Sequence, residues 1–414
     1  MMRRELNLLN AWQSDGQSMF NYGANQSTIK EMNRRLVFDV LNTMGKCSRT
    51  RIATITGLTK TTITNITNEM INEGIIVEAE ATGSGVGRKQ ILLEVSSDSS
   101  RAIGISINRD RVCVSLVNLR GEILYATNLK LTGDDSSEEF LDLVISGCDS
   151  ALEANGNHKV LGIGVASIGP LDADNGVILE PQNFGKISNV HIVQLLSERY
   201  KMQVILENDM NASAIAERMF GCGRKYSNFI YLGVTKGVGA GLFIDGNLFK
   251  GSNGHAGDVG HISIDYKGRL CECGNRGCLE MYASIPAIEK EASDWLPNKT
   301  NFQYSNGIWE TIVFEARRGH EEAYKLIMLM VEYLAVALVT LCNVYDPQVI
   351  ILGHEVVEAE DMLLCSLNSQ INSKGLSKKN AEVEVIISHF GSEIGHIAGA
   401  SIIIYQFVNN GAVD

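Results

Sequence analysis

The sequence has little proline, no long uncharged apolar run and no secretion signal. Its five prolines, and 40 glycines without a three-residue period, exclude collagen-like and proline-rich disordered chains. The longest apolar stretch, 327–342, contains Glu332 and is too short to span a bilayer comfortably, so a buried helix explains it better. Nine cysteines make an odd number, which argues against a disulfide framework. We therefore expect a soluble, cytoplasmic protein with no membrane partner.

The length and the charge distribution predict more than one domain. A chain of 414 residues with 45% hydrophobic and 20% charged residues is long enough for two or three domains with real cores. Residues 1–95 carry 11 basic against 9 acidic side chains, which leaves 25 against 39 for the remainder. A slightly basic head therefore precedes an acidic body.

The head contains three helical patterns in succession. Apolar side chains recur at helical spacing over 28–45, and the predicted buried stripe consists of Met32, Leu36, Val37, Val40 and Leu41. Ser48 can cap a short helix that packs Ile52 and Ile55. Gly57 then supplies a tight turn, and Thr59 can cap a second helix. The inner face of that helix is predicted to carry Ile63, Ile66 and Met70. This order is typical of a helix-turn-helix.

The outer face of the second helix is polar, and a hairpin with a basic tip follows it. Two apolar strands flank a glycine-rich loop over 75–95, as in a wing. The residues predicted to contact DNA are Lys60, Thr61, Thr62, Thr64, Asn65, Arg88 and Lys89. We expect an N-terminal arm over 1–26 and a winged helix-turn-helix DNA-binding domain over 27–95. A small helical domain for dimerisation or protein contact is the alternative.

The body shows a faint internal duplication. Strand-forming groups at 102–124 and 229–249 are each followed by helical stretches, which predicts an α/β fold of two similar lobes with a cleft between them. The first lobe is expected over 100–220 and the second over 221–414, and the last helix could return to the first lobe.

Three cysteines and a histidine lie close together in a glycine-rich segment, 254–280. Cys271, Cys273 and Cys278 follow ten residues after His261. Three thiolates and one imidazole complete the tetrahedral ligand set of structural zinc. Three reduced, unliganded thiols are the alternative, and His255 in the same segment is expected to be a surface or loop histidine.

A second polar cluster, 207–217, follows a short apolar strand and begins a helix. Carboxylates at strand ends commonly face a cleft, so Asp209 is a candidate general base for a hydroxyl. In the alternative interpretation, Asn208 or Asp209 only caps the helix.

Several of these segments together resemble the ROK family (repressor, open reading frame, kinase), in particular its helix-turn-helix sugar repressors of the N-acetylglucosamine and xylose repressor type. The similar segments are the winged head, 162–172, 207–212, the histidine–cysteine segment and 346–353. The resemblance implies an actin/hexokinase-like (ribonuclease H-like) body that binds a sugar in its cleft, with zinc bracing the sugar loop. It also implies that Asn208, Asp209, Asp258, His261 and Glu280 contact the sugar. Asp258 stands where the family usually has glutamate.

The motifs that bind ATP in ROK kinases are altered in this chain. The usual Asp-x-Gly-Gly-Thr turn is replaced by 106–110, where Ser106, Asn108 and Arg109 occupy the positions of the aspartate and both glycines. Lys236 takes the place of a phosphate-facing threonine, and His354 takes that of a glycine. The resemblance therefore implies that ATP and Mg²⁺ do not bind productively.

The sequence predicts a transcriptional regulator, most simply a repressor of carbohydrate-metabolism genes, that binds double-stranded operator DNA and responds to a sugar. A homodimer or homotetramer is expected, and no catalytic residue. The alternative is a bifunctional sugar kinase with a DNA-binding head, in which Asp209 is the general base. A third possibility is a regulator controlled by a protein partner.

Overall fold

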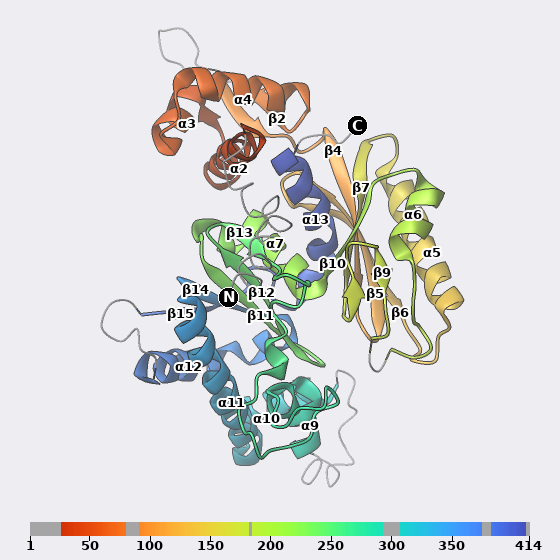
Figure 1. The fold of residues 1–414 in the computed structure, drawn as a ribbon, viewed down its shortest axis with the longest axis vertical. Helices are drawn as coiled ribbons and strands as arrows, with labels where there is room; N and C mark the ends of the chain where they lie inside the picture. The colour runs from red at the N-terminus through yellow and green to blue at the C-terminus, as the bar shows by residue number, and fades with distance from the viewer. Residues whose placement is uncertain (1–25, 80–90, 182–183, 293–306, 375–381, 411–414) are drawn as a thin grey trace, which may run out of the picture. The chain divides into compact units, whose positions relative to one another are not determined.

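The computed structural model describes residues 26–79, 91–181, 184–292, 307–374 and 382–410 (Figure 1). The chain divides into two compact units. The first contains the residues up to Ser96 together with those from Gln406 onward, and the second contains Ser97–Tyr405. The predicted wing tip with Arg88 and Lys89, and the N-terminal arm up to residue 25, lie outside the described residues.

The described part of the first unit before Ser96 consists of three helices and a small antiparallel sheet. The helices are α2 (Gln26–Met44), α3 (Arg49–Thr56) and α4 (Lys60–Asn72). The strands β1 (Cys47–Ser48), β2 (Ile76–Ala79) and β3 (Leu92–Val95) pair in the order β1-β3-β2. Ser48 and Thr59 cap α3 and α4 through their side chains, and Gly57 adopts φ of 72° in the turn between them, as predicted.

The apolar stripes of this unit are partly those predicted. Ile63, Ile66 and Met70 on α4 are buried, as are Val37 and Leu41 on α2. Three predictions are wrong, because Met32, Leu36 and Ile55 are exposed. Phe38 is fully buried instead, and the buried guanidinium of Arg34 hydrogen-bonds Glu73 and the Val408 carbonyl, so the inner face of α2 is rotated from the predicted one.

The second unit contains two five-stranded sheets. The first has the order β10-β7-β4-β5-β6 and consists of β4 (Ser100–Ile107), β5 (Arg111–Asn118), β6 (Ile123–Lys130), β7 (Lys159–Ser167) and β10 (Val204–Asn208). The second has the order β13-β12-β11-β14-β15 and consists of β11 (Phe229–Val234), β12 (Val238–Ile244), β13 (Asn247–Phe249), β14 (Val349–Gly353) and β15 (Glu384–Ile387). Two lobes with similar sheets follow from this arrangement.

Helices cover both faces of each sheet, and the first sheet receives one helix from a distant part of the chain. On the first sheet, α5 (Ser137–Asn155) and α6 (Ile192–Tyr200) pack on one face (Figure 1). The other face receives α13 (Gly395–Asn410), which approaches so closely that a Cβ on Gly164 would lie 1.9 Å from the Gly399 carbonyl oxygen. On the second sheet, α7 (Asp209–Phe220) packs Met210 and Ala214 against glycines of β11 and β12.

The remaining helices build the core of the second lobe. They are α8 (Glu280–Ala283), α9 (Ile285–Ala292), α10 (Ile308–Arg317), α11 (Glu321–Tyr345) and α12 (Glu360–Lys374). Among the described helices, α11 alone is long and apolar enough to cross a membrane. Ile327, Met330, Leu334 and Leu338 on it are fully buried in this core, which identifies it as the internal helix that the sequence predicts.

Short elements complete the fold near the cleft. The strands β8 (Leu171–Asp172) and β9 (Val177–Ile178) form a small ribbon. The 3-10 turns are η1 (Cys222–Lys225), η2 (Val259–His261), η3 (His354–Ala359) and η5 (Gly391–Ile394). Among these turns, η2 positions side chains of the cleft, and the start of α8 positions another.

Candidate functional site

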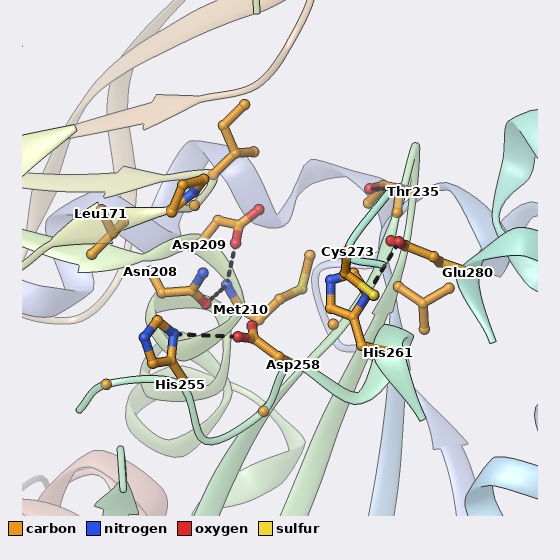
Figure 2. Close-up of a pocket in the computed structure, with 18 of the residues that line it drawn as sticks. Leu171, Asn208, Asp209, Met210, Thr235, His255, Asp258, His261, Cys273 and Glu280 are labelled. Atoms are coloured by element: carbon orange, nitrogen blue, oxygen red, sulfur yellow. Dashed lines mark hydrogen bonds and ion pairs between the residues drawn. The ribbon is translucent and has the colours of Figure 1, made fainter. Parts of the chain in front are cut away.

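A cleft of about 340 Å³ opens in the second unit, at the end of β10 and beside β12. Its volume falls within the roughly 300–1,000 Å³ typical of small-molecule sites. All five residues predicted to contact sugar line it: Asn208, Asp209, Asp258, His261 and Glu280 (Figure 2). They come from the junction of β10 with α7, from η2 and from the start of α8.

Asn208 serves the helix and the cleft together. Its Oδ1 accepts hydrogen bonds from the backbone N–H groups of Met210 and Asn211, at 2.9 and 3.2 Å, and so caps α7. The two interpretations of this residue, helix cap and ligand contact, are therefore compatible. Its amide nitrogen is the group left for a ligand, since an amide NH₂ can donate two hydrogen bonds.

Asp209 follows at the first position of α7 and is partly buried in the cleft. Desolvation raises the pKa of Asp209 from 3.8 to about 6, while the hydrogen bond from the Met210 N–H and the positive charge of Arg109 act in the opposite direction. Near neutral pH the group is a carboxylate that can accept a hydrogen bond from a hydroxyl.

Glu280 and His261 connect the cleft with the cysteines. The Glu280 Oε1 lies 3.3 Å from His261 Nδ1 and 3.2 Å from Cys271 Sγ. Figure 2 shows Glu280 and His261 facing each other across one side of the cleft. A substitution of either residue would therefore affect both the cleft and the cysteine cluster.

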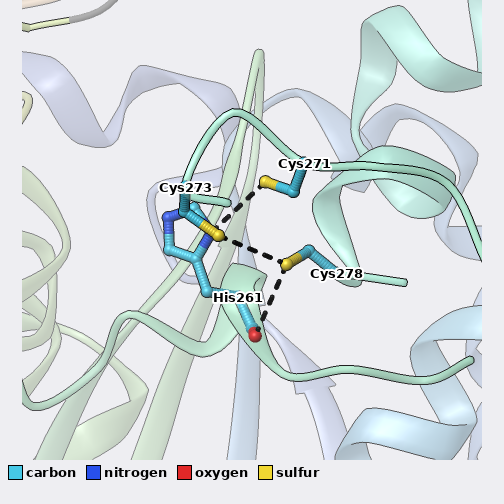
Figure 3. Close-up of side chains that lie close together, drawn as sticks. All are labelled: His261, Cys271, Cys273 and Cys278. Atoms are coloured by element: carbon cyan, nitrogen blue, oxygen red, sulfur yellow. Dashed lines mark hydrogen bonds between the residues drawn. The ribbon is translucent and has the colours of Figure 1, made fainter. Parts of the chain in front are cut away.

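The four predicted metal ligands converge (Figure 3). The ligand atoms of His261, Cys271, Cys273 and Cys278 all lie within 4.8 Å of one another. Cys271 Sγ is 3.7 Å from His261 Nδ1, and the sulfurs of Cys273 and Cys278 are 3.6 Å apart. This group could hold a metal ion, and among the described residues it is the cluster of metal-binding side chains that the structure brings together.

Three polar residues of the cleft were not predicted from the sequence as part of the site. Arg109, Glu180 and His255 line the cleft. Arg109 was interpreted only as a replaced glycine, and His255 only as a surface or loop histidine. Neighbouring residues in the sequence could not indicate that these two side chains share a cleft. Arg109 belongs to the turn between β4 and β5, while His255 comes from the loop before η2.

Side chains also occupy the region where the altered kinase motifs meet. Ser106 Oγ donates a 2.6 Å hydrogen bond to the Gly395 carbonyl at the start of α13, and Lys236 Nζ lies 3.2 Å from Asp110 Oδ2. His354 is buried with φ of 66° and contacts the ring of Tyr231. Burial lowers the pKa of His354 to about 4, so its imidazole is neutral at physiological pH.

The raised pKa of Asp209 predicts a pH-dependent change in stability. The unfolded chain loses the Asp209 proton near pH 4 and the folded chain near pH 6, so the free energy of unfolding falls as the pH rises between these values. Asp209→Asn removes this cost. We expect the variant to gain on the order of 1–3 kcal/mol over the wild type at pH 7.5, and less at pH 5.

Urea unfolding at both pH values measures this difference, and Asp174→Asn, at an exposed carboxylate, is the matched control. An advantage of Asp209→Asn that is equal at pH 5 and pH 7.5 would contradict the raised pKa.

Comparison with known proteins identifies the family. The ROK family profile matches residues 102–406. The chain is 30% identical over 373 residues to the xylose repressor of Caldicellulosiruptor bescii, covering 87% of this chain and 93% of that one. It is 28% identical over 394 residues to the DNA-binding transcriptional dual regulator NagC of Escherichia coli K12, covering 94% and 95%.

Solved structures agree with this assignment. A ROK family transcriptional regulator, described as a homolog of the E. coli MLC protein, superposes with a TM-score of 0.76 at 25% identity and covers 93% of this chain and 98% of its own. A ROK family glucokinase from Streptomyces griseus, in complex with glucose and AMPPNP, shares the fold of the body, with a TM-score of 0.64 at 23% identity over 73% of this chain and 98% of its own. The resemblance seen in the sequence is confirmed, and the chain belongs to the ROK family.

Proposed function

We propose that this chain is a transcriptional repressor of carbohydrate-metabolism genes and that a sugar bound in the cleft changes its affinity for operator DNA. The observation that carries the proposal is the similarity to named regulators over nearly the whole chain, head and body together, as with NagC over 94% of this chain. The polar cleft supplies the effector site that such a regulator needs.

The first unit supports DNA binding. Two capped helices, α3 and α4, are joined by a short turn, and the paired strands β2 and β3 follow as the base of a wing. Lys60, Thr61, Thr64 and Asn65 are exposed on α4, whereas the Thr62 hydroxyl hydrogen-bonds Thr59 at the helix start. Short polar side chains and a lysine on an exposed helix suit contacts to base edges and phosphates. Arg88 and Lys89, which lie outside the described residues, are retained from the sequence as candidate DNA contacts.

The cleft supports binding of a neutral sugar. Carboxylates of Asp209, Asp258 and Glu280 accept hydrogen bonds, and the Asn208 amide donates them. A polyol fits this set because each of its hydroxyls can donate and accept, and a buried polar group left unpaired costs free energy. The sugars that appear in the names of two relatives, the xylose repressor and the N-acetylglucosamine repressor, belong to this chemical class.

Zinc is the metal that fits the cluster best. Zn–S bonds of about 2.3 Å in a tetrahedron place neighbouring sulfurs roughly 3.8 Å apart. The sulfurs of Cys273 and Cys278, 3.6 Å apart, approach this value. The Sγ of Cys271 lies 3.7 Å from His261 Nδ1. We infer that His261, Cys271, Cys273 and Cys278 hold a structural Zn²⁺, with His261 Nδ1 toward the ion and Nε2 left for the sugar. The ion would brace the loop that carries Asp258 and Glu280.

The region of the altered phosphate motifs argues against a kinase. Glycines that could approach a nucleotide phosphate are replaced by Asn108, Arg109 and His354. Ser106, Lys236 and His354, which stand at altered positions of these motifs, contact neighbouring residues instead. We infer that phosphotransfer was lost while Asp209 was retained for sugar binding.

A homodimer fits this function best. The DNA-binding domain of each chain would contact one half-site of the operator. Two such domains related by a two-fold axis would bind half-sites that lie about one helical turn of DNA, or a multiple of it, apart. A sugar can shift DNA affinity only as far as it binds the two states of the dimer differently. The cytoplasm, where operator DNA and sugar meet, is the corresponding location.

The DNA-binding face can be tested at Lys60. Lys60→Ala should weaken binding to a duplex that the wild type selects from genomic fragments, by about tenfold at low salt, and should reduce the slope of log K against log[salt] by roughly one per lost phosphate contact. Fluorescence anisotropy over a salt series measures both quantities. Lys159→Ala, which removes an exposed lysine of the body, is the control. Failure of the wild type to select any duplex would overturn the repressor function, and unchanged binding of Lys60→Ala would remove this residue from the DNA face.

The metal centre can be tested at Cys278. Cys278→Ser should lower the zinc content of the purified protein, measured by atomic emission, and should weaken sugar binding because the loop with Asp258, His261 and Glu280 loses its brace. Cys365→Ser, at an exposed cysteine outside the cluster, should do neither. Full zinc content and an unchanged sugar affinity in Cys278→Ser would rule out this role.

A further inference from the structure

Glu207 is a buried carboxylate next to the ligand-facing residues of the cleft. It lies in β10, one residue before Asn208, and its side chain is only 5% exposed. Its Oε1 accepts two hydrogen bonds of 3.0 Å, one from the Asn208 N–H and one from Nδ2 of Asn211, which is buried on α7. One carboxylate oxygen of Glu207 therefore holds the junction of β10 with α7, at which Asn208 and Asp209 enter the cleft.

The other carboxylate oxygen of Glu207 pairs with a lysine from the second lobe. Its Oε2 forms an ion pair with Nζ of Lys250, whose side chain is 49% exposed. Lys250 directly follows β13 of the second sheet, whereas Glu207 belongs to the first sheet. A buried carboxylate without a cation or hydrogen bonds is costly, so Lys250 compensates the charge of Glu207. The ion pair thereby connects the ends of two strands from different lobes.

The main chain of Lys250 holds a second segment of the cleft. The Lys250 carbonyl accepts a 3.1 Å hydrogen bond from the Ala256 N–H. Gly251 adopts φ of 72°, and a Cβ there would lie 3.2 Å from the Ala256 Cβ, so the chain turns back tightly at this point. Asp258, two residues after Ala256, lines the cleft together with Asn208 (Figure 2). Lys250 thus contacts both segments, the one before Asn208 with its side chain and the one before Asp258 with its backbone.

Lys250 and Glu207 could act on a ligand only through their neighbours. Among the described residues that line the cleft, neither of the two is found. Hydrogen bonds to an ionised group are about twice as strong as those between neutral groups. A binding site requires its polar groups to be held within about 0.5 Å of the productive geometry. The pair of Glu207 with Lys250 supplies such a restraint where the two lobes meet.

We propose that Lys250 is a positioning residue of the cleft, which acts through Glu207 to fix the β10–α7 junction relative to the loop that carries Asp258. The inference rests on the proposed function, because its readout is the binding of a neutral sugar. It assigns no ligand contact to Lys250. It predicts that sugar binding requires the charge of the lysine rather than its bulk.

The test removes each charge of the pair in the full-length protein. Lys250→Met keeps an apolar stem of similar length, and Glu207→Gln keeps an oxygen that can accept hydrogen bonds from Asn208 and Asn211. Isothermal titration calorimetry with D-xylose, D-glucose and N-acetylglucosamine gives the dissociation constants. Each variant should bind the sugar that the wild type prefers about tenfold more weakly, whereas Lys250→Arg, which keeps the cation, should lose much less.

A double variant shows whether Lys250 acts through Glu207. Lys250→Met combined with Glu207→Gln should bind about as weakly as either single variant, because both substitutions break the same ion pair. Losses that multiply in the double variant would mean that the two residues act separately, and would overturn the inference. Glu207→Gln buries no unpaired charge, so its comparison with the wild type and the double variant decides the question even if Lys250→Met alone does not fold.

A matched control is Lys325→Met. Lys325 pairs with Glu321 at 2.7 Å on α11, away from the cleft, so the sugar affinities should be unchanged. Melting temperatures separate positioning from a purely structural role. Lower melting temperatures of Lys250→Met and Glu207→Gln, with sugar affinities equal to those of the wild type, would show that the pair only stabilises the fold and would overturn the inference.

Failure of the inference and failure of the proposed function can be told apart. A wild type that binds none of the three sugars would overturn sugar sensing itself, and the inference with it. A wild type that binds sugar, with unchanged affinities in Lys250→Met and Glu207→Gln, would overturn the inference and leave the proposed function standing.

Discussion

The cleft depends on a segment that has almost no regular structure, 254–280, and on the contacts that hold it in place. Backbone hydrogen bonds tie this segment to β12 at Gly257, and the side chains of one histidine and three cysteines gather at its other end. His255 and Asp258 lie on either side of Gly257, His261 belongs to the cluster, and Glu280 follows two residues after Cys278. A segment with so little regular structure needs such contacts to keep one conformation. The geometry of the cleft therefore depends on the histidine–cysteine cluster and on the packing of Gly257 against β12.

Local patterns predicted local structure well. Ser48, Gly57 and Thr59 form the caps and the turn of the head because capping requires only neighbours in sequence. The spacing of His261 and the cysteines predicted the cluster for the same reason. The buried face of α2 could not be read equally well. Its apolar residues allow more than one stripe, and the packing of α2 in the folded head decided in favour of Phe38 over Met32 and Leu36.

Features that depend on contacts between residues far apart in the chain could not be predicted from the sequence. The close approach of Gly399 to Gly164 brings α13 onto the first sheet, and neither glycine carries a signal for the other. Arg109 and His255 line the same cleft from different lobes, so their place in it could be found only from the fold. The fold of the body also occurs in a glucokinase, so the fold by itself does not decide between a kinase and a regulator.

The central claim is that sugar in the cleft controls binding of the head to DNA. The most direct measurement is the affinity of the full-length protein for its selected operator, by fluorescence anisotropy, with and without the sugar that binds the cleft best. A coupling free energy of about 1–3 kcal/mol would change the affinity roughly 5- to 150-fold, and Mg·ATP should leave it unchanged. The account predicts that sugar shifts the affinity within this range. Equal affinity with and without a sugar that demonstrably binds, or a shift caused by Mg·ATP, would contradict it.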